Sequence, residues 1–177
     1  NINVENVPNT KEGMIGIYTK NGNFTNEGNV KITNTNTLGF GIISSGTDVT
    51  NKGDITLEDS SNVTKANIGM YTAGSDSLRN IGKITVGKNG IGIYGKNFSN
   101  GDSATLPNST IEVGENGIGV YTKAGTGENV KLESGSIKTS KDGVGVYIAG
   151  NGGTITASNP FNMTLGDGSS DADKGAF

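Results

Sequence analysis

One short motif recurs through the whole sequence and constrains its fold more than any other feature. The motif has the form glycine–aliphatic–glycine–aliphatic–tyrosine, and its clearest copies read GIGIY at 90–94, GIGVY at 117–121 and GVGVY at 143–147. Looser copies lie at 13–18, 39–43 and 67–71. The central glycines are 23 to 28 residues apart: Gly16, Gly41, Gly69, Gly92, Gly119 and Gly145. A repeat of this length is typical of proteins that stack one small structural unit.

A second block follows each copy of the first, with the form Asn-x-Gly-x-h-x-h, where h is apolar. It reads NEGNVKI at 26–32, NKGDITL at 51–57, NIGKITV at 80–86 and NGGTITA at 151–157, and degenerate copies lie at 107–113 and 133–139. Both blocks alternate with period two, which is the period of a β-strand. In the first block this pattern places Ile91 and Ile93 on one face of a strand, and the glycines and Tyr94 on the other.

One copy of the repeat is too small to bury its apolar residues, so the copies must stack with equivalent strands paired. We therefore predict an all-β chain that folds as a right-handed parallel β-helix of about six coils, each of roughly 25 residues. Residues 13–177 would form this solenoid, and residues 1–12 a lead-in or capping segment. A propeller is excluded, because a blade needs about 40 residues and four strands. Open ends of the stack are unpaired strand edges, so we expect either that the N-terminal segment caps the stack or that the chain self-associates end to end.

Composition excludes several functional classes. The sequence has no His and no Cys, so a His-based triad, a Cys nucleophile, a Cys/His zinc site and disulfides are all excluded. The net charge of −3 argues against a nucleic-acid partner. No apolar run approaches the length of about 20 residues that a membrane-spanning helix needs. Acidic residues do not pair at repeated strand positions, so we expect no enzyme, no metal site and no cofactor.

Turns and insertions are predicted from the glycine-rich junctions. GKNG at 87–90, GENG at 114–117 and SKDG at 140–143 each hold an Asn-Gly or Asp-Gly pair, which supplies the positive φ of a tight corner. Longer insertions fall at Gly95–Leu106 and Thr122–Leu132. Because equivalent corners lie side by side on a rod, these insertions should form a decorated edge.

Two columns of identical residues should run along the stack. Tyrosine occupies one slot as Tyr18, Tyr71, Tyr94, Tyr121 and Tyr147, and asparagine another as Asn26, Asn51, Asn80 and Asn151. The tyrosines could stack on sugar rings, but a stacked ladder that stabilises the rod is the favoured interpretation. The asparagines should bond one another and the turn backbone, since a buried amide needs partners.

Phe98 departs from the repeat and lies in the first long insertion. A loop phenylalanine on a polar rod is either a local small core or a contact residue. On the second interpretation Phe98, Asn100 and Asp102 are the candidate ligand-binding residues, with an aromatic anchor among polar contacts.

The two blocks together, in a chain without Cys and rich in Asn, Thr, Gly and Lys, resemble the passenger repeats of large type V autotransporter adhesins of Gram-negative bacteria, most closely the fusobacterial type. The resemblance implies a rod on the bacterial cell surface, anchored to the outer membrane by a C-terminal translocator barrel that is absent from this sequence. It implies a host or bacterial surface protein or glycan as partner, and no direct membrane insertion of this segment. The alternatives are a plain structural stalk and, as the weakest, an enzyme that acts on polysaccharide.

Overall fold

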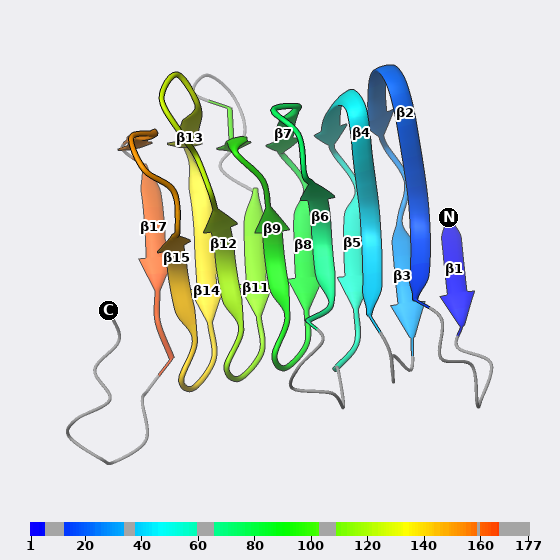
Figure 1. Cartoon of the computed structure of the whole chain (residues 1–177). Helices are drawn as coiled ribbons and strands as arrows, with labels where there is room; N and C mark the ends of the chain where they lie inside the picture. The colour runs from blue at the N-terminus through cyan, green and yellow to red at the C-terminus, as the bar shows by residue number, and fades with distance from the viewer. Residues whose placement is uncertain (6–12, 34–37, 60–65, 103–108, 159, 167–177) are drawn as a thin grey trace.

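The computed structural model describes residues 1–5, 13–33, 38–59, 66–102, 109–158 and 160–166. All of its regular structure in these ranges is β-strand, and every paired strand runs parallel to its neighbours. The strands stack as a solenoid of about five turns, which confirms the predicted parallel β-helix but not the expected number of about six coils. Figure 1 shows the coils following one another along the rod from the N-terminal to the C-terminal end.

One sheet collects the strands of the second blocks at 26–32, 51–57, 80–86, 107–113 and 133–139. Its neighbours follow the order β1-β3-β5-β8-β11-β14-β17. These strands are β1 (Ile2–Glu5), β3 (Val30–Thr33), β5 (Asp54–Leu57), β8 (Lys83–Val86), β11 (Thr110–Val113), β14 (Gly135–Thr139) and β17 (Phe161–Thr164). The N-terminal strand β1 thus belongs to the sheet, where Ile2 lies beside Val30. The strand of the second block at 151–157 lies in the other sheet, so its assignment to the same column was wrong.

The other sheet covers two sides of the rod. In the first two coils a single long strand covers both sides, as β2 (Met14–Asn26) and β4 (Gly39–Asn51). From the third coil onward two short strands replace it. One row holds β6 (Ile68–Thr72), β9 (Ile91–Tyr94), β12 (Ile118–Thr122) and β15 (Val144–Ile148), and the other holds β7 (Ser77–Asn80), β10 (Asn97–Asn100), β13 (Asn129–Leu132) and β16 (Thr154–Ala157). We call these rows the first and second faces, and the sheet that begins with β1 the third face.

The core consists of apolar columns that point inward from the three faces. On the third face Ile55, Ile84 and Ile111 lie in register and are fully buried. On the first face Met70 and Ile93 form an equivalent column. Each column places an apolar side chain at the spacing of neighbouring strands. Apolar contact therefore continues from coil to coil.

The two aliphatic positions of the first block do not share a face, which corrects the alternation expected for Ile91 and Ile93. Ile93 is fully buried, whereas Ile91 is only partly buried, and exposure at the equivalent position ranges from 7% at Ile68 to 45% at Ile15. The central glycine points inward instead. A Cβ on Gly119 would lie 2.5 Å from Cγ2 of Ile137 and 2.6 Å from the carbonyl oxygen of Gly145. The central glycine is therefore required by the close approach of the third face.

In each corner turn one residue adopts a positive φ and the next must lack a Cβ. Asn89, Asn116 and Asp142 adopt positive φ of 54° to 56°. The following glycine does not supply the positive φ; at Gly90 a Cβ would collide with the side chain of Val86. The dipeptide was correctly recognised as a turn, and its Asn or Asp carries the left-handed conformation that these residues tolerate best after glycine.

Candidate ligand-binding groove

A buried asparagine ladder fixes the corner between the second and third faces. Asn26 Nδ2 donates to Asn51 Oδ1 over 2.7 Å, and Asn51 Nδ2 donates to Asn80 Oδ1 over 3.0 Å. Each of these amides also donates to the carbonyl oxygen two residues ahead, for example from Asn80 to Gly82 over 3.1 Å. The predicted asparagine column is therefore confirmed for these three residues.

The fourth member of the ladder is Asn100 and not Asn151. Asn80 Nδ2 donates to Asn100 Oδ1 over 2.9 Å, and Asn100 is fully buried. Asn151 is exposed, so its assignment to the column was wrong. Asn100 was missed as a column residue because Gly101 follows it directly, whereas the motif has one residue between Asn and Gly. As a buried scaffold residue, Asn100 cannot be the surface contact that we expected.

Phe98 is also part of the scaffold. It lies in β10, is 3% exposed, and sits in register between Leu78 and Val130. Of the two interpretations of Phe98, the structure supports a core residue and contradicts the candidate ligand contact, because the ring completes an inward column of the second face. A signal was present in the sequence: Phe98 stands two residues before Asn100, as Leu78 stands two residues before Asn80.

Asp102 is the one predicted contact residue that reaches the surface. Its Oδ2 pairs with Arg79 Nη2 over 2.8 Å, and the two side chains are 32% and 39% exposed. Arg79, the single arginine of the sequence, lies between Leu78 and Asn80 on β7, and both of those neighbours point inward. The strand alternation therefore turns Arg79 outward, which could have been predicted from the same pattern.

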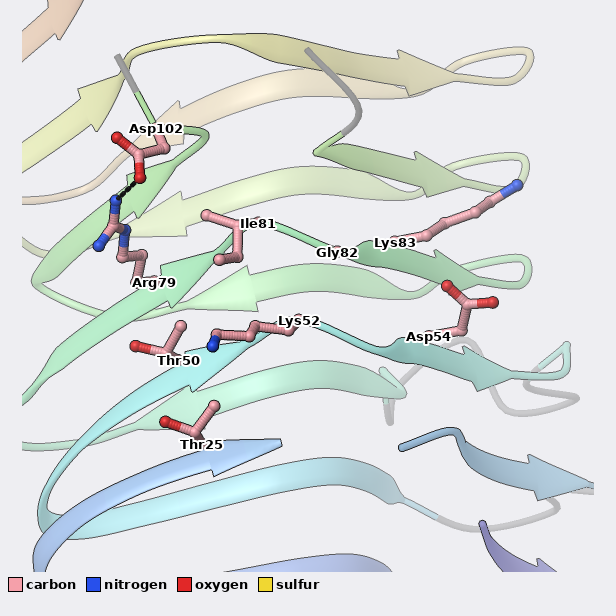
Figure 2. A pocket seen from close by; sticks show the side chains of 9 residues that line it. All are labelled: Thr25, Thr50, Lys52, Asp54, Arg79, Ile81, Gly82, Lys83 and Asp102. Atoms are coloured by element: carbon pink, nitrogen blue, oxygen red, sulfur yellow. Dashed lines mark ion pairs between the residues drawn. The ribbon is translucent and has the colours of Figure 1, made fainter. Parts of the chain in front are cut away.

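The Arg79–Asp102 pair borders an open groove of about 720 Å³ along the corner between the second and third faces (Figure 2). Its walls come from four successive coils. The lining residues are Thr25, Thr50, Lys52, Asp54, Arg79, Ile81, Gly82, Lys83 and Asp102. The strand order therefore assembles the groove, because no single repeat carries more than four of these residues.

Ion pairs hold the charged side chains around the groove. Lys83 Nζ lies 2.7 Å from Glu112, which also pairs with Lys138 over 3.4 Å, and Lys52 lies 3.3 Å from Glu27. The hydrogen bond from Lys83, with help from Lys138, holds the pKa of Glu112 below its usual value. The groove thus presents ammonium and guanidinium donors beside carboxylate acceptors.

The insertion predicted at Thr122–Leu132 is well packed where it follows β12. Ala124 is buried at 2% exposure, and Glu128 accepts hydrogen bonds from the Gly125 amide over 2.6 Å and from Ser75 over 2.8 Å. These bonds, the Gly125 amide first, lower the pKa of Glu128. Of the other insertion, Gly95–Leu106, residues 103–108 lie outside the described ranges.

Four of the five tyrosines form the predicted stack, on the outer surface of the first face, whereas Tyr18 is separated from Tyr71 by Ile43. Ring centroids lie 5.1 Å apart for Tyr71 and Tyr94, 4.9 Å for Tyr94 and Tyr121, and 5.1 Å for Tyr121 and Tyr147. A hydrogen bond to Tyr94 raises the pKa of the Lys123 ammonium. Because each ring stacks on its neighbours, the inner rings have no free face for a sugar.

Among the described residues, no group of three or more acidic side chains is placed to hold a metal ion. No helix long and apolar enough to cross a membrane occurs in those ranges.

Comparison of the chain with protein-family models, curated proteins and solved structures found no match.

Proposed function

We propose that this chain is a segment of a surface-displayed adhesin that attaches a bacterium to a host or bacterial surface protein or glycan. The observation that carries the proposal is the groove lined by Arg79 and Asp102, which four coils build on a continuous scaffold. A site held by backbone pairing on every strand loses little conformational entropy when a partner binds. Extracellular display and an outer-membrane anchor outside this sequence belong to the same proposal, and rest on the resemblance of the repeats to autotransporter passengers.

The chemistry of the groove suits recognition of a polar surface. Each ion pair offers N–H donors and carboxylate acceptors side by side, and hydroxyl or amide groups of a partner can use both at once. The side chain of Ile81 adds an apolar contact among them (Figure 2). Individual contacts of this kind are weak, and display of many copies on one cell would multiply them.

Direct binding tests the proposal. The purified chain would be applied to a glycan array and to panels of host and bacterial cells, beside the Arg79→Ala and Lys141→Ala variants. Both substitutions remove one positive charge, but the Lys141 side chain is exposed in a corner turn outside the groove. We expect saturable binding that Arg79→Ala weakens at least tenfold and Lys141→Ala leaves unchanged.

A structural stalk is the second candidate, and the incorporation of Phe98 and Asn100 into regular columns favours it. Such a stalk would hold a distal binding region away from the cell. A folded chain that binds none of the glycans or cells would support the stalk and contradict the adhesin proposal. Equal loss of binding in the Arg79 and Lys141 variants would show that the groove is not the site.

A further inference from the structure

The outer tyrosine column has a geometry that goes beyond scaffolding. Tyr71, Tyr94, Tyr121 and Tyr147 project from equivalent positions of four neighbouring strands, with backbones paired in register. Their ring centroids are 4.9 to 5.1 Å apart, and the planes of Tyr94 and Tyr121 diverge by only 6°. Four phenols are therefore held in van der Waals contact as a continuous row.

The row is accessible from solvent. The Tyr147 side chain is 47% exposed, and the three tyrosines before it are half-buried. The stacked ring faces shield one another, so the exposed part of each residue lies outside the ring contacts. An oxidant in solution can therefore reach part of each of the four residues.

We propose that this row is a site of oxidative cross-linking, in which neighbouring tyrosines join as dityrosine and bind successive coils covalently. Each phenol would lose one electron and one proton to give a phenoxyl radical. Two radicals would then form a bond between ortho carbons, and the two ring hydrogens would return to the oxygens. Hydrogen peroxide with a haem peroxidase takes up the two electrons and two protons as two molecules of water, so the step is balanced.

Preorganisation is the physical reason for expecting this reaction within one molecule. A phenoxyl radical in solution must meet a second one by diffusion, whereas a radical on Tyr121 lies in ring contact with two phenols, and oxidation of either one supplies the second radical in place. Groups held in contact react as if at very high local concentration. Intramolecular links should therefore dominate at protein dilutions at which links between molecules are rare.

Tyr18 is a built-in comparison. It is the most exposed tyrosine whose exposed fraction is given, at 56%, but Ile43 occupies the neighbouring position on β4. Exposure alone would favour oxidation at Tyr18. Neighbouring phenols, by contrast, favour coupling among the four stacked tyrosines.

The test is oxidation of the dilute chain with hydrogen peroxide and peroxidase, followed by tryptic digestion and mass spectrometry. Tyr94, Tyr121 and Tyr147 fall in separate tryptic peptides, 89–96, 97–123 and 142–174. We expect these peptides to appear joined in pairs, and the mass of each pair should be two hydrogens below the summed masses of the two free peptides. Dityrosine fluorescence should appear in the monomer band of a denaturing gel.

Matched variants locate the links. Tyr121→Phe keeps a stacked ring but removes the phenol, so it should abolish both links of residue 121 while the Tyr71–Tyr94 link remains. Tyr18→Phe should leave every intramolecular link unchanged. The proposal is overturned if links form only between molecules, if Tyr18 couples as readily as the stacked tyrosines, or if Tyr121→Phe leaves the peptide pairs intact. These results do not depend on ligand binding, so failure of the cross-linking proposal would leave the adhesin proposal unaffected.

Discussion

Asn80 occupies the middle of the buried ladder, and its amide is fully used. Oδ1 accepts from Asn51, and Nδ2 donates to Asn100 and to the Gly82 carbonyl. A buried polar atom that loses its partner costs about 1–3 kcal/mol. The ladder therefore stabilises the corner because every member is satisfied by its neighbours.

Asn80→Ala should lower the free energy of unfolding by about 1–3 kcal/mol, because it leaves Asn100 Oδ1 without its ladder donor and Asn51 Nδ2 without its ladder acceptor. Urea denaturation followed by circular dichroism measures the loss. The exposed Asn151 provides the control, and Asn151→Ala should stay within about 0.5 kcal/mol of the parent. Equal losses in the two variants would contradict the ladder as a source of stability.

At Gly119 the third face leaves no room for a side chain. Gly119→Ala should destabilise the chain by about 1–3 kcal/mol, since the new Cβ would be only 2.5 Å from the side chain of Ile137. Gly28→Ala meets no atom nearer than 3.8 Å and should be neutral or slightly stabilising in the same urea experiment. A neutral Gly119→Ala would mean that the third face can shift outward at little cost.

At the scale of the strand, β10 combines a core residue, a ladder residue and, just after its end, a residue of the groove. Phe98→Ala removes a buried ring and should cost about 3–5 kcal/mol in the free energy of unfolding. Phe98→Leu introduces the residue type that Leu78 has in the same column, and should lower the free energy of unfolding by less than about 1.5 kcal/mol. Unfolding curves that show little cost for Phe98→Ala would return Phe98 to the candidate contact residues.

Glu112 on β11 links three coils through Lys83 and Lys138. Its folded-state pKa lies below the unfolded value, so the stabilisation is fully present above the unfolded pKa of about 4.3 and is lost as the pH falls through the folded pKa. Glu112→Gln should lower stability by about 0.5–1 kcal/mol at neutral pH, and the difference should vanish in strongly acidic buffer.

Urea unfolding of parent and Glu112→Gln at both pH values measures this difference. A double-mutant cycle with Lys83→Met isolates the pair, because the Glu112 effect should shrink once its main partner is absent. A difference that persists in strong acid would assign the effect to packing and not to charge.

Strand-level prediction from the sequence succeeded where the repeat is regular and failed where an insertion interrupts it. The parallel stack, the corner turns and three of four ladder asparagines follow from period-two alternation and from the spacing of Asn and Gly. Asn100 and Phe98 were misplaced because the insertion after β10 breaks the motif on one side, although the pattern on the other side is intact. The groove could not be predicted as a site, since its lining comes from coils up to 77 residues apart, from Thr25 to Asp102.

At the scale of the whole molecule, the described strands at the two ends of the rod pair on one side only. These are β1 and β2 at one end, and β15, β16 and β17 at the other. Apolar side chains are exposed at the second end, with Ile148 at 56% and Met163 at 43%. Unpaired edges of this kind template further strand pairing.

We therefore expect the 177-residue chain to self-associate end to end as its concentration rises. Sedimentation velocity over a range of concentrations measures the effect, and Ile148→Lys with Met163→Lys should shift the chain toward monomer. A species that stays monomeric at the highest concentrations would contradict this prediction.

The register of the strands has a consequence for how such a chain can change in length. Ile91, Ile118 and Val144 are interchangeable in register, as are Ile84, Ile111 and Ile137. Removal of one entire coil, such as 91–117, would join Gly90 to Ile118 and keep the aliphatic and tyrosine columns in register, although Asn80 would then lie beside Leu132. Removal of half a coil would set unlike positions against one another where the two remaining parts meet. Genes for proteins of this design can therefore lengthen or shorten by recombination between copies, in whole-coil steps, without a new fold having to arise at the junction.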